Sequence, residues 1–275
     1  MRQSRAVLAN LLLLVVASCV RPHAIATGLP LRVMTYNIAA GHGDLEGVAD
    51  AIRAEHPDVV ALQEVDVHWH ARSGYADQAT ILAQRLGMEM RFARIYSLAG
   101  ATVGAPTREY GVALLSRYPI VAFRNHLLTR LSTVQEGAAP TPMPGFLEAV
   151  VDVSGTLVRI FDTHTDYRPD PAVRVQQVTE MLAIIGDGRE PALLFGDLNA
   201  PPGALELQPL LRRLRDNWSR AEDPGLTYPA TVPVKRIDYV LSSGHFRVRS
   251  IRVPATEASD HRPVVADLVL DPMRN

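Results

Sequence analysis

Apolar residues recur along this chain at two spacings, one typical of strands and one typical of helices. Short apolar runs bounded by Gly, Pro, Asn, Asp or Ser predict strands. These runs lie at residues 31–38, 58–62, 89–96, 111–115, 120–126, 150–153, 156–161, 192–195, 236–241, 246–253 and 263–270. Only Ser154-Gly155 separates two of the runs, which predicts a tight hairpin between them.

Three segments carry apolar residues at intervals of three and four, the spacing of an amphipathic helix. The first covers residues 45–55. The second is expected to be capped by Asp77 and closed by Gly87, and the third opens at Asp170-Pro171 and includes Val175 on its apolar face. The chain therefore combines helices with many short strands.

Strand–helix alternation and tight hairpins occur together, which disfavours a purely parallel sheet. The mixture fits the α/β class, with two mixed sheets packed face to face and helices on the outside. No linker divides residues 31–270, so we expect a single domain there. Residues 129–144 are rich in Thr, Ala and Pro and predict a long surface loop.

The first residues are expected to be an export signal rather than part of the domain. Arg2 and Arg5 precede an apolar run, and Cys19, the only cysteine, follows that run directly. Residues 1–19 resemble the signal peptide and lipobox of bacterial lipoproteins, whose acylated cysteine tethers the protein to a membrane. Cleavage after Ala26 is the alternative, and it predicts a soluble periplasmic or secreted protein.

Composition and charge exclude some kinds of protein and binding site. Of the 275 residues, 47% are hydrophobic and 21% charged, which is typical of a globular protein. The 28 basic and 29 acidic residues give a net charge of −1, so a polybasic nucleic-acid surface is not expected. A single cysteine excludes internal disulfides and a Cys-ligated zinc site. No protein partner is indicated, and we expect a monomer.

Polar residues that could bind a ligand or take part in catalysis lie at the ends of several predicted strands. They are Asn37, Glu64, His164, Asp197, Asn199, Asp238, Asp260 and His261. Buried strand ends accept such groups only where each finds a partner or a ligand. Gathered at one end of a sandwich, they predict a cleft with carboxylates for a hard metal ion and histidines for phosphate.

At these residues the chain resembles the endonuclease/exonuclease/phosphatase superfamily, the deoxyribonuclease I-like fold, in a compact bacterial branch. The matching segments occur in the family order and are residues 34–38, 62–65, 110–116, 163–164, 196–200, 236–239 and 259–263. They extend over essentially the whole of residues 31–270. The resemblance implies a four-layer α/β/β/α sandwich that hydrolyses a phosphoester with a divalent metal.

The resemblance also implies a role for each residue of the site. Glu64 is expected to be the principal ligand of Mg²⁺ or Mn²⁺, with Asn37 and Asp260 close by. Asp197 is expected to orient or deprotonate the attacking water, and Asn199 to hold Asp197 in register.

The remaining roles concern the phosphate. His261, paired with Asp238, is expected to face the phosphoryl oxygens, and His164 to be a second donor to them. Tyr110 is expected to line the cleft. The substrate is a lipid head group, a nucleic acid or a small phosphate ester, and its identity stays open.

Other interpretations are weighed against this one. A secreted nuclease of the same fold and a catalytically inactive, surface-anchored binding protein both remain alternatives. A zinc hydrolase built on His68, His70 and His164 is disfavoured because the first two follow a strand in a loop-like segment. Pro144-Gly145-Phe146 stands where related sequences carry an acidic-Pro-Arg element, which predicts a weaker cation at the cleft.

Overall fold

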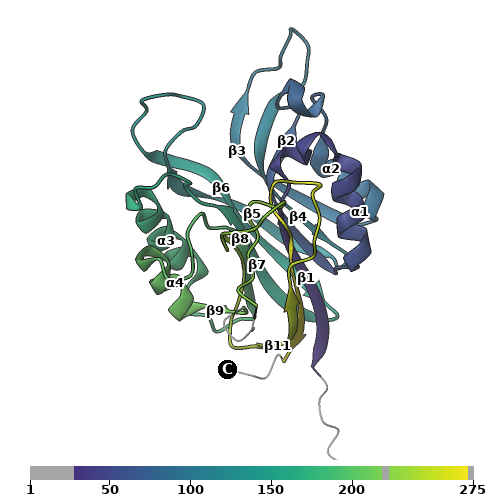
Figure 1. Ribbon diagram of the computed structural model, residues 1–275, viewed down its shortest axis with the longest axis vertical. Coiled ribbons are helices and arrows are strands. Elements are labelled where there is room, and N and C mark those ends of the chain that lie inside the picture. The colour runs from purple at the N-terminus through teal and green to yellow at the C-terminus, as the bar shows by residue number, and fades with distance from the viewer. Residues whose placement is uncertain (1–27, 219–222, 272–275) are drawn as a thin grey trace, which may run out of the picture.

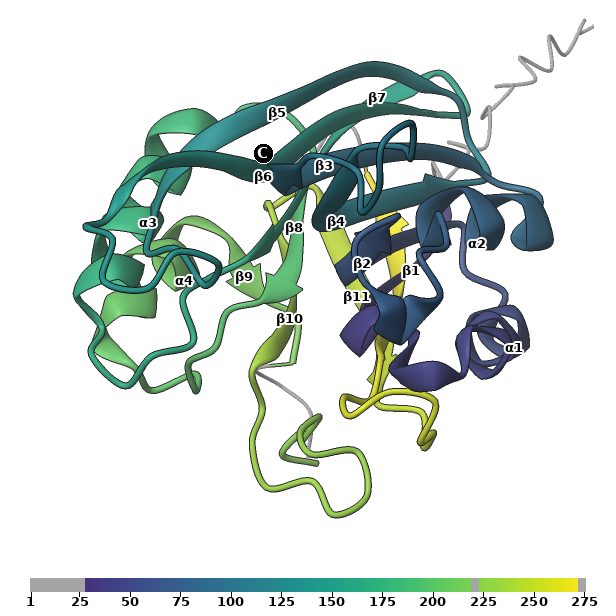
Figure 2. The same cartoon turned by 90° about the horizontal axis from the view of Figure 1, so that it is seen from above.

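The computed structural model describes residues 28–218 and 223–271. The predicted export signal, with Cys19 and the alternative cleavage site after Ala26, lies outside these described residues. Two six-stranded sheets pack face to face, and helices cover their outer faces (Figures 1 and 2). The predicted α/β/β/α sandwich of two mixed sheets is confirmed.

The first sheet has the strand order β11-β12-β1-β2-β4-β3. Its strands are β1 (Leu29–Asn37), β2 (Val59–Val67), β3 (Glu89–Leu98), β4 (Arg108–Ser116), β11 (Phe246–Arg252) and β12 (Val264–Leu270). Only β1 and β2 are parallel neighbours. Their register ends with Asn37 opposite Gln63, so Asn37 and Glu64 reach the same edge of the sheet.

The second sheet has the order β5-β6-β7-β8-β10-β9. Its strands are β5 (Ile120–Arg130), β6 (Thr141–Val153), β7 (Thr156–His164), β8 (Ala192–Asp197), β9 (Arg215–Asp216) and β10 (Asp238–Ser242). Strands β7 and β8 run parallel with His164 opposite Asp197, and Asp238 of β10 lies opposite Asp197 on its other side. Three predicted site residues are thus direct cross-strand neighbours.

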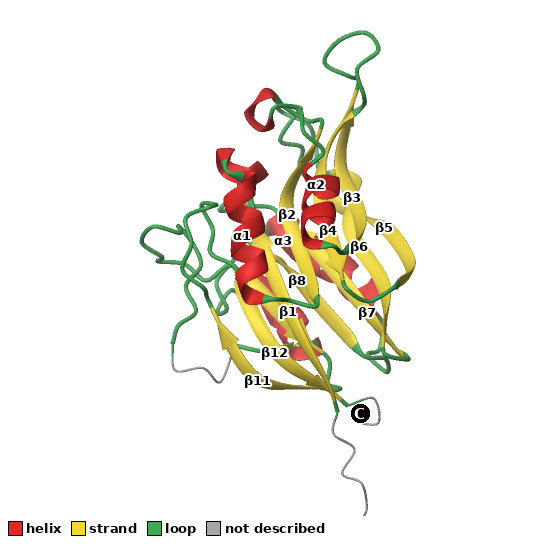
Figure 3. Cartoon of the chain, turned by 90° about the vertical axis from the view of Figure 1, so that its right-hand side faces the viewer, coloured by secondary structure: helices red, strands yellow, loops and turns green. Residues whose placement is uncertain are grey.

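Helices form the two outer layers. The α-helices are α1 (Leu45–Glu55), α2 (Gln78–Leu86), α3 (Ala172–Ile185) and α4 (Gln208–Arg213), and short 3-10 helices lie at Ala39–Gly43, Ala71–Ser73 and Leu205–Leu207. Helices α1 and α2 cover the first sheet (Figure 3), and α3 and α4 cover the second. Asp77 caps α2 by accepting from the Thr80 N–H at 3.0 Å, and Gly87 ends it in the left-handed conformation, as predicted.

Buried apolar side chains form a core between the sheets and one beneath each helical layer. A polar contact also crosses the interface between the sheets. Gln63 of β2 donates its Nε2 to Asp162 Oδ1 of β7 at 2.7 Å, and both side chains are fully buried. Burial raises the pKa of Asp162 well above its usual range, which favours the neutral carboxyl.

The structure differs from the sequence prediction in two places. The loop predicted at residues 129–144 is present but shorter, covering residues 131–140, because β5 continues to Arg130 and β6 begins at Thr141. The prolines of β6 are tolerated there since β7 pairs with β6 only from Leu147 onward. Val175 is 49% exposed, because α3 is rotated so that polar Arg174 and Gln177 are buried instead.

Within residues 28–218 and 223–271, no helix has the length and apolar content that crossing a membrane requires.

Candidate active site

Glu64 owes its position to an irregularity in β2. The pairing of β2 with β4 shifts register between Leu62 and Val65, and Glu64 has a φ of 57°. A non-glycine residue rarely adopts this left-handed conformation, and bulges of this kind redirect side chains next to active sites. Glu64 is half-buried and lines a pocket at this end of the sandwich.

Asn37 joins the two sheets at the site. Its Nδ2 donates to Glu64 Oε1 and to Asp197 Oδ2, each at 3.1 Å, and its Oδ1 accepts from the Ala39 N–H at 3.1 Å. Both polar atoms of this fully buried amide are therefore occupied. The structure shows the Asn37 amide as a donor that holds two carboxylates together, and its place close to a metal stays a prediction.

Asp197 lies at the centre of the cluster, at the end of β8. Besides the bond from Asn37, its Oδ1 accepts from the backbone N–H of Asn199 at 2.9 Å. Asn199 is fixed in turn because its Nδ2 donates to the Thr165 carbonyl at 3.1 Å. Gly196 permits this close packing, since a Cβ there would lie 2.2 Å from the Thr163 carbonyl oxygen.

Two imidazoles face Asp197. His164 Nε2 lies 3.6 Å from Asp197 Oδ2, and His261 Nε2 lies 3.7 Å from the same oxygen. These separations are longer than a hydrogen bond but within the range of an ion pair. Asp197 Oδ2 thus faces both imidazole rings and also accepts from the Asn37 amide.

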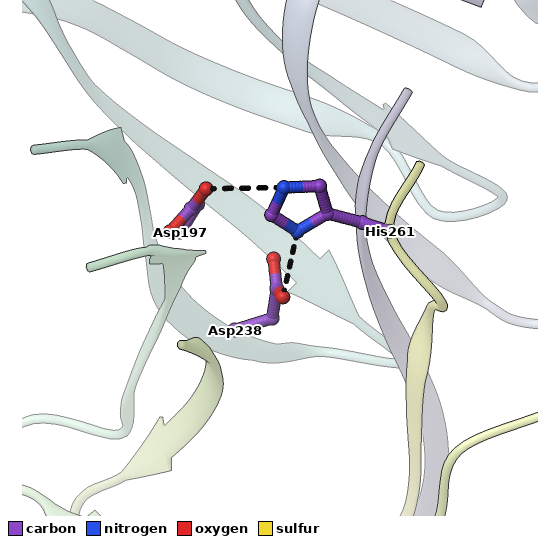
Figure 4. Close-up of side chains that lie close together, drawn as sticks. All are labelled: Asp197, Asp238 and His261. Atoms are coloured by element: carbon purple, nitrogen blue, oxygen red, sulfur yellow. Dashed lines mark hydrogen bonds and ion pairs between the residues drawn. The ribbon is translucent and has the colours of Figure 1, made fainter. Parts of the chain in front are cut away.

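His261 is held by Asp238 on its other side. The Nδ1 of His261 lies 2.9 Å from Asp238 Oδ2, so its Nε2 faces Asp197 (Figure 4). The Thr227 hydroxyl donates to the same Asp238 oxygen. The Tyr228 ring lies 4.7 Å from the His261 ring between centroids. Thr227 and Tyr228 therefore fix the Asp238–His261 pair from the segment before β10.

The charged groups of the cluster shift one another's pKa values. Burial and the neighbouring charge of Asp238 raise the pKa of Asp197 to about 6, although both histidines oppose the shift. Burial favours a neutral His261, but the charge and hydrogen bond of Asp238, with the charge of Asp197, outweigh it and raise the pKa of His261 to about 10. At neutral pH the cluster therefore holds an ionised carboxylate beside an imidazolium.

A pocket of about 180 Å³ opens beside this cluster. It is lined by Glu64, Ile95, Tyr96, Tyr110, Arg130, Leu131, Thr133, His164, Thr165, Asp166, Tyr167 and Gln177. Tyr110 stacks on Tyr96 with 6.1 Å between ring centroids, and Trp69 packs against both rings. The structure thus places Tyr110 in an aromatic wall next to Glu64 and His164.

Comparison with known proteins assigns the chain to a family. The profile of the Endonuclease/Exonuclease/phosphatase family matches residues 34–261, a range that contains every residue of the cluster. This chain belongs to that family. Members of the Endonuclease/Exonuclease/phosphatase family are hydrolases that act on phosphoesters.

Three relatives show how far the likeness extends. The protein YbhP of Escherichia coli (strain K12) is 25% identical over 264 residues, which cover 87% of this chain and 96% of YbhP. Protein cwh43 of Schizosaccharomyces pombe is 30% identical over 149 residues, 54% of this chain but only 14% of cwh43. The crystal structure of an endonuclease/exonuclease/phosphatase from Beutenbergia cavernae aligns with a TM-score of 0.71 and 27% identity, covering 88% of this chain and 72% of that one.

The Endonuclease/Exonuclease/phosphatase family generally depends on a divalent metal, and the donors of this cleft fit one. Glu64 and the half-buried Asp260 supply oxygen atoms only, and Mg²⁺ binds through one or two carboxylates while it keeps several waters. Asp197, Asp238 and His261 form the one group of three metal-binding residue types within 4.8 Å among the described residues. In this group the Asp238 carboxylate raises the pKa of the His261 imidazole to about 10 despite burial, which favours the imidazolium.

The zinc site weighed from the sequence is not formed. His68 Nδ1 contacts the Tyr75 carbonyl at 2.8 Å, and His70 Nδ1 accepts from the Arg72 N–H at 3.2 Å. In the part of the chain that the structure describes, no metal-binding group contains these two histidines with His164. They organise the loop after β2.

Sequence reasoning missed three parts of this site. Trp69 lies between the two histidines of the discounted zinc motif, and its aromatic partners come from other strands. Ser259 donates its hydroxyl to the Asn37 carbonyl at 2.8 Å, which ties the segment of Asp260 and His261 to β1. Arg130 was assigned to a loop. None of the three has a local signal for its role, because each role depends on a distant partner.

Proposed function

We propose that this chain is an exported, metal-dependent hydrolase that cleaves a phosphoester bond, as a phosphodiesterase or a phosphatase. The observation that carries the proposal is the convergence of three side chains at one cleft: the Asn37 amide joins Glu64 of the first sheet to Asp197 of the second, and His261 faces the same Asp197 carboxylate. Membership of the Endonuclease/Exonuclease/phosphatase family supports the same reaction. Glu64 and Asp260 are proposed to hold Mg²⁺ or Mn²⁺.

Asp197 is proposed to orient the attacking water and accept its proton. It is ionised at neutral pH, and the bonds from Asn37 and Asn199 fix both of its oxygens. A general base must be held within hydrogen-bond reach of the proton it removes, and these bonds meet that need. When bound, the metal polarises the phosphoryl group and neutralises developing charge.

The two histidines are proposed to stabilise the phosphoryl oxygens. His261 carries a proton because Asp238 raises its pKa, and it presents Nε2 toward the cluster. His164 reaches the same region from β7. Preorganised donors of this kind stabilise the transition state because they need no rearrangement as charge develops. No covalent nucleophile is required.

Hydrolysis can be tested with the purified protein lacking residues 1–26. It is expected to release p-nitrophenol from bis(p-nitrophenyl) phosphate or from p-nitrophenyl phosphate with Mg²⁺ or Mn²⁺, and to stop in EDTA. Glu64→Gln is expected to lower the rate by about 10²-fold or more, since it weakens the proposed metal site.

Glu109→Gln is the matched control for that change. Glu109 lies on β4 beside Tyr110, but its carboxylate pairs with Arg94 at 3.3 Å and does not line the pocket. Its rate is expected to stay within about twofold of the wild type. Complete inertness toward both esters with both metals contradicts the proposed reaction.

We also propose that the enzyme acts at the cell envelope through an acylated Cys19. The sequence supports this proposal, because Cys19 directly follows the apolar run of the leader. Radiolabelled palmitate is expected to enter the wild-type protein but not Cys19→Ser. Label in neither protein rejects acylation and favours cleavage after Ala26.

A further inference from the structure

Arg130 is a buried cation in the wall of the active-site pocket. It ends β5, and the residue is only 6% exposed. Its guanidinium donates to three main-chain oxygens: Nε to Pro144 at 3.2 Å, Nη1 to His164 at 2.7 Å and Nη2 to Gly145 at 2.9 Å. A guanidinium has five N–H groups, so two remain for a ligand.

No acid of the described chain neutralises this guanidinium. The acids whose charges reach it are Asp166 and Glu180, and each is engaged elsewhere. Asp166 pairs with Arg168, and Glu180 accepts from the N–H and hydroxyl of Thr129 at 2.6 and 2.7 Å. Burial lowers the pKa of Arg130 to about 10, which leaves it charged at neutral pH. A buried charge without a partner is costly unless a ligand supplies one.

Gly145 of β6 leaves room for the Arg130 side chain. Gly145 has a φ of 114°, and a Cβ there would lie 2.2 Å from Ile95 Cγ1. The position next to Pro144 therefore carries no side chain, and Arg130 from the neighbouring strand bonds to its main chain instead. The expectation of a weaker cation at Pro144-Gly145-Phe146 is thus offset by an arginine that the sequence pattern did not identify.

Aromatic rings and the catalytic cluster surround Arg130 in the pocket. Tyr96 and Tyr110 provide flat aromatic surfaces, while Glu64 and His164 lie at the catalytic end of the pocket. The Tyr96 hydroxyl accepts from Thr133 N–H at 2.9 Å and Oγ1 at 3.0 Å, which holds the β5–β6 loop against the pocket. Arg130 bonds to the His164 main chain, so it adjoins the catalytic cluster without bonding to a catalytic side chain.

We propose that Arg130 makes this pocket a subsite for a second anionic group, a phosphate or a carboxylate, carried by the organic part of the phosphoester. The inference rests on the proposed function and names the substrate class of that site. The reacting phosphoryl group lies at the Asp197 cluster, and the second anion pairs with the free N–H groups of Arg130. The carbon skeleton between them packs on Tyr96 and Tyr110.

Binding in EDTA tests the subsite without turnover. Calorimetry compares glycerol 3-phosphate with 3-phosphoglycerate, and glucose 6-phosphate with glucose 1,6-bisphosphate. The member of at least one pair that carries two separate anionic groups is expected to bind the wild type about tenfold or more tightly than its partner with one such group. The first pair probes a carboxylate and the second a phosphate. Arg130→Met is expected to reduce the preference to less than about threefold, and Arg130→Lys to retain part of it.

Arg91→Met is the matched control. Arg91 also donates to main-chain oxygens, those of Met90 and Ile120, but it lies near the start of β3, whereas the pocket residue Tyr96 lies near the end of that strand. It is expected to keep the wild-type preference. Equal affinities within both pairs for the wild type, or an unchanged preference in Arg130→Lys and Arg130→Met, overturn the subsite. If Arg130→Met does not fold, the wild-type pairs and Arg130→Lys decide. If the wild type prefers the ligands with two anionic groups but hydrolyses no ester, the proposed function is rejected and the subsite is retained.

Discussion

Asp197→Asn is expected to lower kcat by about 10³-fold or more, because the amide cannot accept the proton of the attacking water. The substitution preserves the shape of the side chain and the acceptor for the Asn199 N–H. A carboxyl whose pKa is raised on folding loses stability as the pH rises through the interval between its unfolded and folded pKa values. With a folded pKa of about 6, the ionised Asp197 lowers stability at pH 7.5, so we expect the neutral variant to melt no more than a few degrees below the wild type.

Initial rates with p-nitrophenyl esters and the melting temperature together check this prediction. Asp50→Asn is a suitable control, since Asp50 is an exposed residue of α1 that pairs with Arg53 and does not belong to the cluster. Its rate is expected to be unchanged. A folded Asp197→Asn protein with a rate within tenfold of the wild type removes Asp197 from the mechanism.

The second large effect is expected at the Asp238–His261 pair. His261→Gln is expected to lower kcat by about 10²–10⁴-fold, because it removes the imidazolium that faces the phosphoryl oxygens. Asp238→Asn is expected to cost less, since Asp238 acts through the tautomer and charge of His261. The double variant is therefore expected to be no slower than His261→Gln alone.

A double-mutant cycle measures this coupling from kcat of the four proteins. Multiplicative losses mean that Asp238 contributes independently of His261, and the positioning role is then wrong. The ratio of KM values gives a second check, because loss of transition-state stabilisation lowers kcat more than it raises KM.

Local signals predicted much of this fold. Asp77 and Gly87 mark the ends of α2 through bonds to residues next to them, and Ser154-Gly155 forms the turn between β6 and β7. The topology was predicted from the family motifs, because their order along the chain matches that of one known sandwich fold. The ends of the strands at Arg130 were less visible, since they are stabilised by pairing with residues 141–143 across a loop.

The site was predictable as a set of residues but not as a geometry. Glu64 is aimed by a bulge that no neighbouring residue signals. The family resemblance placed Asn37 close to the metal but gave no sign that its amide bridges two carboxylates of different sheets. The subsite arginine was hidden in a stretch whose Thr and Pro content suggested a loop. Each of these depends on contacts across the sandwich.

The Asn37 amide links the two sheets at the candidate active site. It belongs to the first sheet and reaches the aspartate of the second, and the Gln63–Asp162 contact lies beside it along the same seam. Neither sheet alone contains the whole cluster, so the cluster depends on how the two sheets are aligned. A sideways slip between the layers would separate Glu64, the proposed metal ligand, from Asp197, the proposed base, even if every strand stayed paired.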